Sequence, residues 1–154
     1  MDAWTETDRG APDAALGGSR RLRVYVAATT REGTRCALVA AKRLADGLDA
    51  RIIILVPHVV SYVVPLDSPG EDPTVLIDQY GALASNAAVD AAVRLCLCRR
   101  PIDVFKALLD DHATIVIGGR RGRCWPSAAQ RTARRLRREG YDVVFIEMQP
   151  SCLG

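Results

Sequence analysis

The sequence predicts an α/β fold, in which a five-stranded, doubly wound parallel sheet carries helices on both faces. Two observations lead to this prediction. Apolar runs and segments of helical periodicity alternate along the chain in the order β-α-β-α-β-α-β-α-β. The stretch from Arg51 to Pro57 is continuous and largely β-branched, which is typical of a strand covered on both faces. Right-handed crossovers between such parallel strands place helices on both sides of the sheet.

A length of 154 residues corresponds to one domain, which we assign to residues 21–148. Residues 1–20 contain few large apolar side chains and carry Gly-Gly-Ser near their end, so we expect a flexible tail there. Residues 149–154 are expected to form a short C-terminal tail.

The first strand and helix are predicted at the start of the domain. From Leu22 to Val26, apolar residues alternate with Arg23 and Tyr25, as in a strand. Thr29–Thr30 follow as an N-cap, and Glu32 supplies an acidic residue in the first turn of a helix. This helix is expected to end near Gly47–Asp49.

The remaining elements are predicted from apolar periodicity and from the Pro and Gly residues that separate the segments. They are the strand Arg51–Pro57, a helix marked by Leu76 to Ala87, the strand Val89–Cys98, a short helix beginning at Pro101, the strand Thr114–Ile117, a helix marked by Ala129 to Leu136, and the strand Tyr141–Met148. We expect Gly118–Gly119 to terminate the fourth strand. Gly140 stands where a glycine that ends a helix belongs.

Charge is distributed unevenly along the chain. The net charge is +3, but residues 118–154 hold eight arginines and three acidic residues, whereas residues 1–117 hold 13 basic and 15 acidic residues. No apolar run approaches the roughly 18 residues of a membrane span. The first residues lack the pattern of an export signal, so we expect a cytoplasmic protein without membrane contact.

Two segments are expected to meet at the carboxyl edge of the sheet, where open α/β sheets bind ligands. Ala27–Thr30 follow the first strand, and the Gly-rich, Arg-rich turn Gly118–Arg123 follows the fourth. Backbone N–H groups in such a turn, together with the positive end of a helix dipole, favour an anion. The alternative is a tight turn whose arginines are simply solvated.

Four strings resemble the universal stress protein family: Arg23–Ala27, Leu55–Val59, Ala113–Gly118 and the turn Gly119–Gly122. The resemblance covers about residues 21–148. It implies the strand order 3-2-1-4-5, and a homodimer through the final strand Tyr141–Met148. It also implies a motif Gly-x2-Gly-x9-Gly-Ser/Thr that holds the phosphates of ATP, and an Asp after the first strand.

The sequence departs from that motif in two places. Thr132 and Ala133 stand where the third glycine and the hydroxyl residue belong, and Ala27 to Thr29 occupy the segment of the Asp. We therefore expect a degenerate pocket for ATP or another adenine nucleotide, with Mg²⁺ only as a companion of the nucleotide, where arginines replace lost backbone contacts. The candidate binding residues are Ala28, Thr29, Gly118, Gly119, Arg120, Arg121, Gly122, Arg123 and Thr132.

The resulting hypothesis is a stress-response or regulatory module with no catalytic residues and an unidentified protein partner. One alternative is a universal stress protein that binds ATP and hydrolyses it slowly. A P-loop is excluded because the Gly-x4-Gly-Lys-Ser/Thr motif is absent.

A second alternative is an Arg-rich nucleic-acid-binding module. Arg131, Arg134, Arg135 and Arg138 follow the spacing i, i+3, i+4, i+7 and form one stripe on the last helix. Because no aromatic residue is interleaved with this stripe, we do not expect nucleic acid as a partner.

The cysteines predict neither disulfides nor a metal site, since their spacings are not paired. Cys96 and Cys98 are interpreted as small buried apolar residues. Cys124 lies in the Arg-rich loop and is interpreted as an ordinary loop residue. His58 is interpreted as a hydrogen-bonding structural residue, and His112 as a surface residue.

Overall fold

The computed structural model describes residues 5–9, 22–63, 72–110 and 113–149. The elements are, in chain order, β1 (Thr5–Arg9), β2 (Arg23–Ala27), α1 (Arg31–Leu48), β3 (Arg51–Val59), α2 (Pro73–Asn86), β4 (Ala91–Cys98), α3 (Pro101–Leu108), β5 (Thr114–Gly119), α4 (Ala128–Arg138) and β6 (Asp142–Glu147). All nine elements predicted from the sequence are present.

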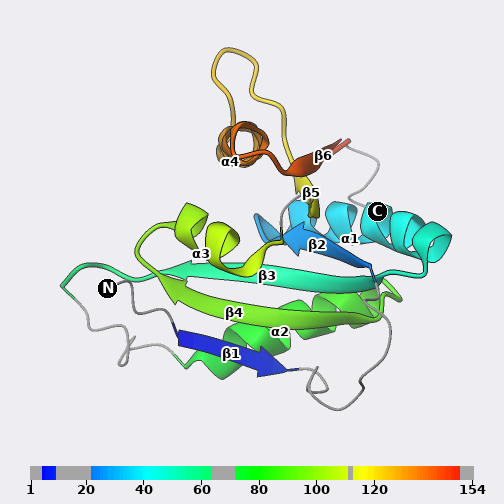
Figure 1. The fold of residues 1–154 in the computed structure, drawn as a ribbon, viewed down its shortest axis with the longest axis horizontal. Coiled ribbons are helices and arrows are strands. Elements are labelled where there is room, and N and C mark those ends of the chain that lie inside the picture. The colour runs from blue at the N-terminus through cyan, green and yellow to red at the C-terminus, as the bar shows by residue number, and fades with distance from the viewer. Residues whose placement is uncertain (1–4, 10–21, 64–71, 111–112, 150–154) are drawn as a thin grey trace.

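The strands form one sheet in the order β1-β4-β3-β2-β5-β6 (Figure 1). The five strands from β2 to β6 are parallel, and their order along the sheet is the expected 3-2-1-4-5. The chain therefore winds outward in one direction from β2 to β4 and in the other from β5 to β6. The order reverses between β2 and β5, which lie side by side at the centre.

Residues 5–9 differ from the expectation of a flexible tail. They form β1, which pairs antiparallel with β4 from Thr5 opposite Leu97 to Arg9 opposite Val93. Without β1, the outer edge of β4 would carry unpaired backbone groups, and a polar segment can satisfy them because the pairing uses the main chain. The segment carries no apolar periodicity that would identify it as a strand in the sequence. Residues 1–4, 10–20 and 150–154 of the two expected tails lie outside the described residues.

The two faces of the sheet bury separate apolar clusters. On one face, side chains such as Val24, Ile54 and Val116 pack against α1 and α2. On the other face, Tyr25, Ile53 and their neighbours pack against α3 and α4. This alternation between adjacent residues of the same strand is the pleat of a sheet covered on both sides. It confirms the doubly wound architecture.

Strand β5 continues through Gly118 and Gly119, so the prediction that these glycines terminate it is wrong. Both are buried. A Cβ on Gly118 would overlap the carbonyl oxygen of Gly33 in α1, and a Cβ on Gly33 would in turn crowd the carbonyl oxygen of Gly118. The glycines therefore permit a close approach of helix and strand rather than a turn.

The helix ends have the capping residues that the sequence predicts. The Thr30 hydroxyl accepts a hydrogen bond from the backbone N–H of Gly33 at 3.1 Å, which caps α1. Gly140 has a φ of 95° directly after the last helix, a conformation that favours glycine. Among the described residues, no helix has both the length and the apolar character that crossing a membrane requires.

The contact between Gly33 and Gly118 gives a first prediction. Gly118→Ala should destabilise the protein by about 1–3 kcal/mol, because the added methyl group forces α1 away from β5. The control is Gly47→Ala in α1, the helix that packs on Gly118, where a Cβ meets nothing within 4 Å. It should stabilise the protein by roughly 0.5–1 kcal/mol through helix propensity. Urea unfolding of both variants measures the difference, and equal stabilities would contradict the proposed overlap.

Candidate functional site

A pocket of about 760 Å³ opens at the carboxyl ends of the strands, next to the reversal of strand order. Pockets for small organic ligands commonly have this size and position. It is lined by Ala27, Ala28, Thr29, Thr30, Glu32, Pro57, Pro101, Phe105, Gly119, Arg120, Ser127, Ala128, Ala129, Thr132 and Met148. The expected meeting of the segments after β2 and β5 is therefore present.

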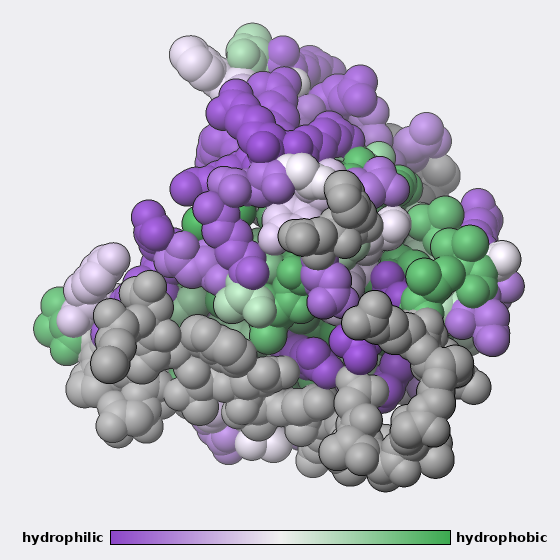
Figure 2. Space-filling model, in the orientation of Figure 1, coloured by the Kyte–Doolittle hydropathy of each residue, from purple (hydrophilic) through white to green (hydrophobic). Residues whose placement is uncertain are grey.

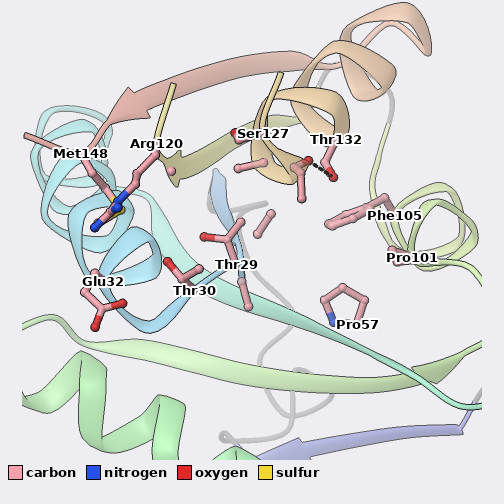
Figure 3. Close-up of a pocket in the computed structure, with 15 residues that line it drawn as sticks. Thr29, Thr30, Glu32, Pro57, Pro101, Phe105, Arg120, Ser127, Thr132 and Met148 are labelled. Atoms are coloured by element: carbon pink, nitrogen blue, oxygen red, sulfur yellow. Dashed lines mark hydrogen bonds between the residues drawn. The ribbon is translucent and has the colours of Figure 1, made fainter. Parts of the chain in front are cut away.

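The pocket has a polar and an apolar side (Figure 3). Glu32, Thr30 and Arg120 lie on the side of α1, whereas Pro57, Pro101 and Phe105 lie on the side of α3. Of the lining residues, Arg120 is the only cation and Glu32 is the only carboxylate, and both are exposed. A ligand with one apolar, flat part and one small polar group matches this division.

The start of α1 is fixed to β5 by a short chain of hydrogen bonds. The Thr29 hydroxyl donates to the carbonyl oxygen of Gly118 at 2.7 Å. The backbone N–H of Thr29 donates to the hydroxyl of Thr34 at 3.0 Å, and that hydroxyl donates to the carbonyl oxygen of Thr30 at 2.8 Å. Because the Thr29 proton is used within the protein, this hydroxyl offers a ligand only its acceptor lone pairs.

The start of α4 is closed by the side chain of Gln130. Its carbonyl oxygen accepts hydrogen bonds from the backbone N–H groups of Gly122, at 2.9 Å, and of Ser127, at 2.8 Å. The Ser127 hydroxyl in turn accepts from the N–H of Gln130 at 3.2 Å, which completes a capping box. The amide oxygen thus serves as the acceptor for two loop N–H groups of the kind that bind anions in glycine-rich turns.

The predicted binding residues fall into two groups. Ala28, Thr29, Gly119, Arg120 and Thr132 line the pocket. The other four predicted residues, Gly118, Arg121, Gly122 and Arg123, are not among the residues that line it.

Three residues of the second group, Gly118, Arg121 and Gly122, contact other residues of the protein. The carbonyl oxygen of Gly118 accepts from Thr29, and the Arg121 guanidinium lies 3.6 Å from the Glu147 carboxylate. Gly122 forms a tight turn, where a Cβ would overlap the carbonyl oxygen of Trp125. Arg123 is exposed.

The sequence missed the apolar side of the pocket. Phe105 lies within the short helix predicted to begin at Pro101, and nothing in the sequence indicates that this residue also lines a cavity. Pro57 belongs to one of the strings that resemble the universal stress proteins, which is the one signal that could have singled it out. Ser127 and Gln130 are three positions apart, as in a capping box, and this spacing is visible in the sequence.

The described cysteines and His58 are not among the residues that line the pocket. Cys96 and Cys98 are buried with Val104 between β4 and α3. Burial, and next the negative charge of Asp103, raise the pKa of the Cys98 thiol to about 11, so it stays protonated at neutral pH. Cys124 is exposed. Within the described part of the chain, no group of three or more His, Cys, Asp or Glu side chains could hold a metal ion.

His58 is not among the residues that line the pocket, and its carbonyl oxygen lies 3.8 Å from the Cys98 sulfur as a hydrogen-bond acceptor. His112 lies outside the described residues.

No protein-family model and no curated protein matches the sequence. The structure is similar to that of a protein from the universal stress protein family from Burkholderia pseudomallei, with 22% identity and a TM-score of 0.53, over 86% of this chain and 100% of that one. It is also similar to a universal stress protein in complex with cAMP, with 19% identity and a TM-score of 0.54, over 85% of this chain and 100% of that one. The chain has the universal stress protein fold.

The role of Gln130 gives a second prediction. Gln130→Ala removes the acceptor shared by two loop N–H groups and should destabilise the protein by about 1–2 kcal/mol. Gln130→Glu keeps an acceptor at the same place and should retain most of the stability. Amide hydrogen exchange at Gly122 and Ser127 measures the effect. Unchanged protection in Gln130→Ala would contradict the assigned hydrogen bonds.

Proposed function

We propose that this chain is a divergent member of the universal stress protein family and acts as a non-enzymatic regulatory or stress-response module. Its pocket would take an adenine nucleotide with a single phosphate group rather than ATP. The observation that carries the proposal is the position of Gln130, whose side chain uses the loop N–H groups that a longer phosphate chain would require. The remainder of the pocket is open and large enough for a nucleoside.

The apolar side of the pocket suits a base. Pro57 and Pro101 offer apolar surface, Phe105 lines the same side with a ring that is only 1% exposed, and Ala28 and Ala129 add small side chains at the pocket. Burying an aromatic ring between such side chains is favourable because it removes apolar area from water. A base in this position would direct its sugar toward Thr29 and Thr30 at the start of α1.

The polar side suits one phosphate. The N-termini of α1 and α4 both lie at the pocket, and their dipoles favour negative charge. Arg120 adds one full positive charge and can make two parallel hydrogen bonds to phosphate oxygens. The Glu32 carboxylate opposes the accumulation of further negative charge, so a triphosphate gains less than a monophosphate. The cAMP bound by one structural neighbour also carries a single phosphate group.

The pocket-lining residues offer little for phosphoryl transfer to water. Catalysis of that reaction depends on cations and backbone donors placed around the β- and γ-phosphates. Here the loop donors from Gly122 and Ser127 are engaged by Gln130, and the Thr132 hydroxyl donates to the carbonyl oxygen of Ala128 at 3.1 Å. This supports a binding role over the alternative of a slow ATPase.

The third prediction concerns nucleotide affinity, measured by isothermal titration of the full chain with AMP, cAMP and ATP plus Mg²⁺. The monophosphates should bind at least about tenfold more tightly than ATP, which corresponds to ~1.4 kcal/mol. Arg120→Gln should weaken monophosphate binding by roughly tenfold or more, because a charge-assisted hydrogen bond is lost. Arg123→Gln is the matched control, since Arg123 carries the same charge but is not a pocket residue. Micromolar binding of ATP that exceeds that of AMP would favour the ATP-binding alternative, and no heat with any nucleotide would refute the proposal.

We also propose that the protein forms a homodimer through β6. This strand ends the sheet on one side, with no further strand beside it among the described residues. The N–H of Asp142 donates to Ala113, just before β5, and that of Met148 donates to Gly119 at the end of β5. The alternation of a strand therefore directs the N–H groups of Val143, Phe145 and Glu147 outward. Arg137 covers one outward acceptor, the carbonyl oxygen of Val143, at 3.0 Å. The other outward groups are available for pairing with a second copy.

The fourth prediction tests this edge. Glu147→Pro removes one outward N–H group without removing a hydrogen bond to β5, and should shift the protein from dimer to monomer. Glu147→Ala removes the same half-exposed carboxylate but keeps the N–H group, and should remain dimeric. Sedimentation velocity of both variants over a concentration series distinguishes them. A monomeric unmodified protein, or a dimer unaffected by Glu147→Pro, would contradict pairing through β6.

A further inference from the structure

A positively charged surface with one exposed aromatic ring lies outside the pocket. We call it the Arg–Trp surface and define it by Arg123, Trp125, Arg131, Arg134, Arg135 and Arg138. The loop between β5 and α4 extends away from the sheet, and strongly hydrophilic residues gather over α4 (Figures 1 and 2). Trp125 in this loop is 83% exposed, although indole is among the largest side chains to leave in water.

The turn that carries Trp125 is held from both sides. The Arg131 guanidinium donates to the carbonyl oxygen of Pro126 at 3.1 Å, and the N–H of Gly122 is bound by Gln130. Gly122 also approaches the carbonyl group of Trp125 so closely that no Cβ would fit. The indole is therefore presented on an ordered turn beside the Arg stripe of α4, which reduces the entropy lost when a partner stacks on it.

The positive charge of the surface is poorly balanced by nearby acids. Glu139 lies 3.1 Å from Lys106, and Glu147 pairs with Arg121. Asp103 is bound by Arg100 at 2.9 Å, and this hydrogen bond, with the charges of Lys106 and Arg135 as smaller causes, lowers the pKa of the Asp103 carboxyl. These three carboxylates are thus engaged by other cations, and the stripe Arg131, Arg134 and Arg138 is exposed, whereas Ala133 and Leu136 of the same helix are buried.

We infer that the Arg–Trp surface binds single-stranded nucleic acid, with a base stacked on Trp125 and backbone phosphates along the arginines of α4. Arg131 and Arg138 are separated by about 10 Å along the helix axis, so the charges form a track rather than a point. An aromatic ring can stack only on a base that is not already paired and stacked, which favours a single strand over a duplex.

The geometry argues against a lipid surface. A helix that lies on a membrane buries an apolar face in it, but the apolar face of α4, formed by Ala129, Ala133 and Leu136, is already packed against the sheet. The sequence did not predict nucleic acid, because no aromatic residue is interleaved with the Arg stripe. Trp125 precedes the helix in sequence and joins the stripe only through the fold.

The test is a titration of the full chain into fluorescently labelled dT20 and rU20, followed by anisotropy at several KCl concentrations. The logarithm of the binding constant should fall with the logarithm of salt concentration by about 0.7 for each phosphate contact. The double variant Arg134→Gln/Arg138→Gln should weaken binding and flatten this slope by about 1.4. Arg35→Gln/Arg43→Gln on α1 removes the same charge from exposed positions elsewhere and should leave the slope unchanged.

Trp125→Ala should weaken binding roughly 5- to 150-fold without changing the slope, as expected for the loss of one stacked base. Trp125→Phe, which keeps an aromatic face, should recover most of the affinity. The inference is overturned if the oligonucleotides do not bind at 50 mM KCl, or if neither the Trp125 nor the Arg134/Arg138 variant differs from the unmodified protein. It is equally overturned if vesicles of phosphatidylserine and phosphatidylcholine, or poly-glutamate, bind more tightly than the oligonucleotides in the same buffer.

Discussion

The close contact between α1 and β5 is the constraint on which the rest of the structure depends. Gly33 and Gly118 allow the helix backbone to lie against the strand backbone, and the Thr29 hydroxyl bonds the carbonyl oxygen of Gly118 at 2.7 Å. This contact fixes the N-terminus of α1 beside the end of β5, where the strand order reverses. Because β5 continues straight into the loop that begins at Arg120, the same contact also determines where that cation enters the pocket.

A second constraint concerns the backbone N–H groups of the loop before α4, which can bond either to the protein or to an anion. A glycine-rich turn before a helix exposes N–H groups that must find partners, either in a ligand or in the protein. Here Gln130 supplies the partner for Gly122 and Ser127, so the turn is satisfied without a ligand. Under the proposed function, the pocket therefore offers phosphate fewer backbone donors than a glycine-rich turn without Gln130 would offer.

The architecture could be predicted because it rests on periodic apolar patterns, as the alternation along Val24 to Ala27 and the buried run Ile52–Val56 illustrate. The strand β1 could not, since it is held by main-chain pairing and its residues carry no such pattern. Gly118 was predicted as a strand terminator because glycine has no side chain to indicate a close packing partner 85 residues away in the sequence. Of the candidate site, the meeting of the segments after β2 and β5 was foreseen, whereas the lining by Phe105 depends on the packing of α3.

The loop from Arg120 to Ser127 joins the two proposed binding surfaces. Its first residue, Arg120, lines the pocket, whereas Trp125 is exposed to solvent and is not among the lining residues. Gln130 and Arg131 hold the loop through side-chain bonds to its backbone, so its conformation is set by α4 rather than by a ligand. A preformed loop of this kind loses little conformational entropy when either partner binds. The Arg-rich end of the chain therefore contains two positive regions with different environments: a single arginine at the mouth of a cavity, and an open stripe beside an exposed ring.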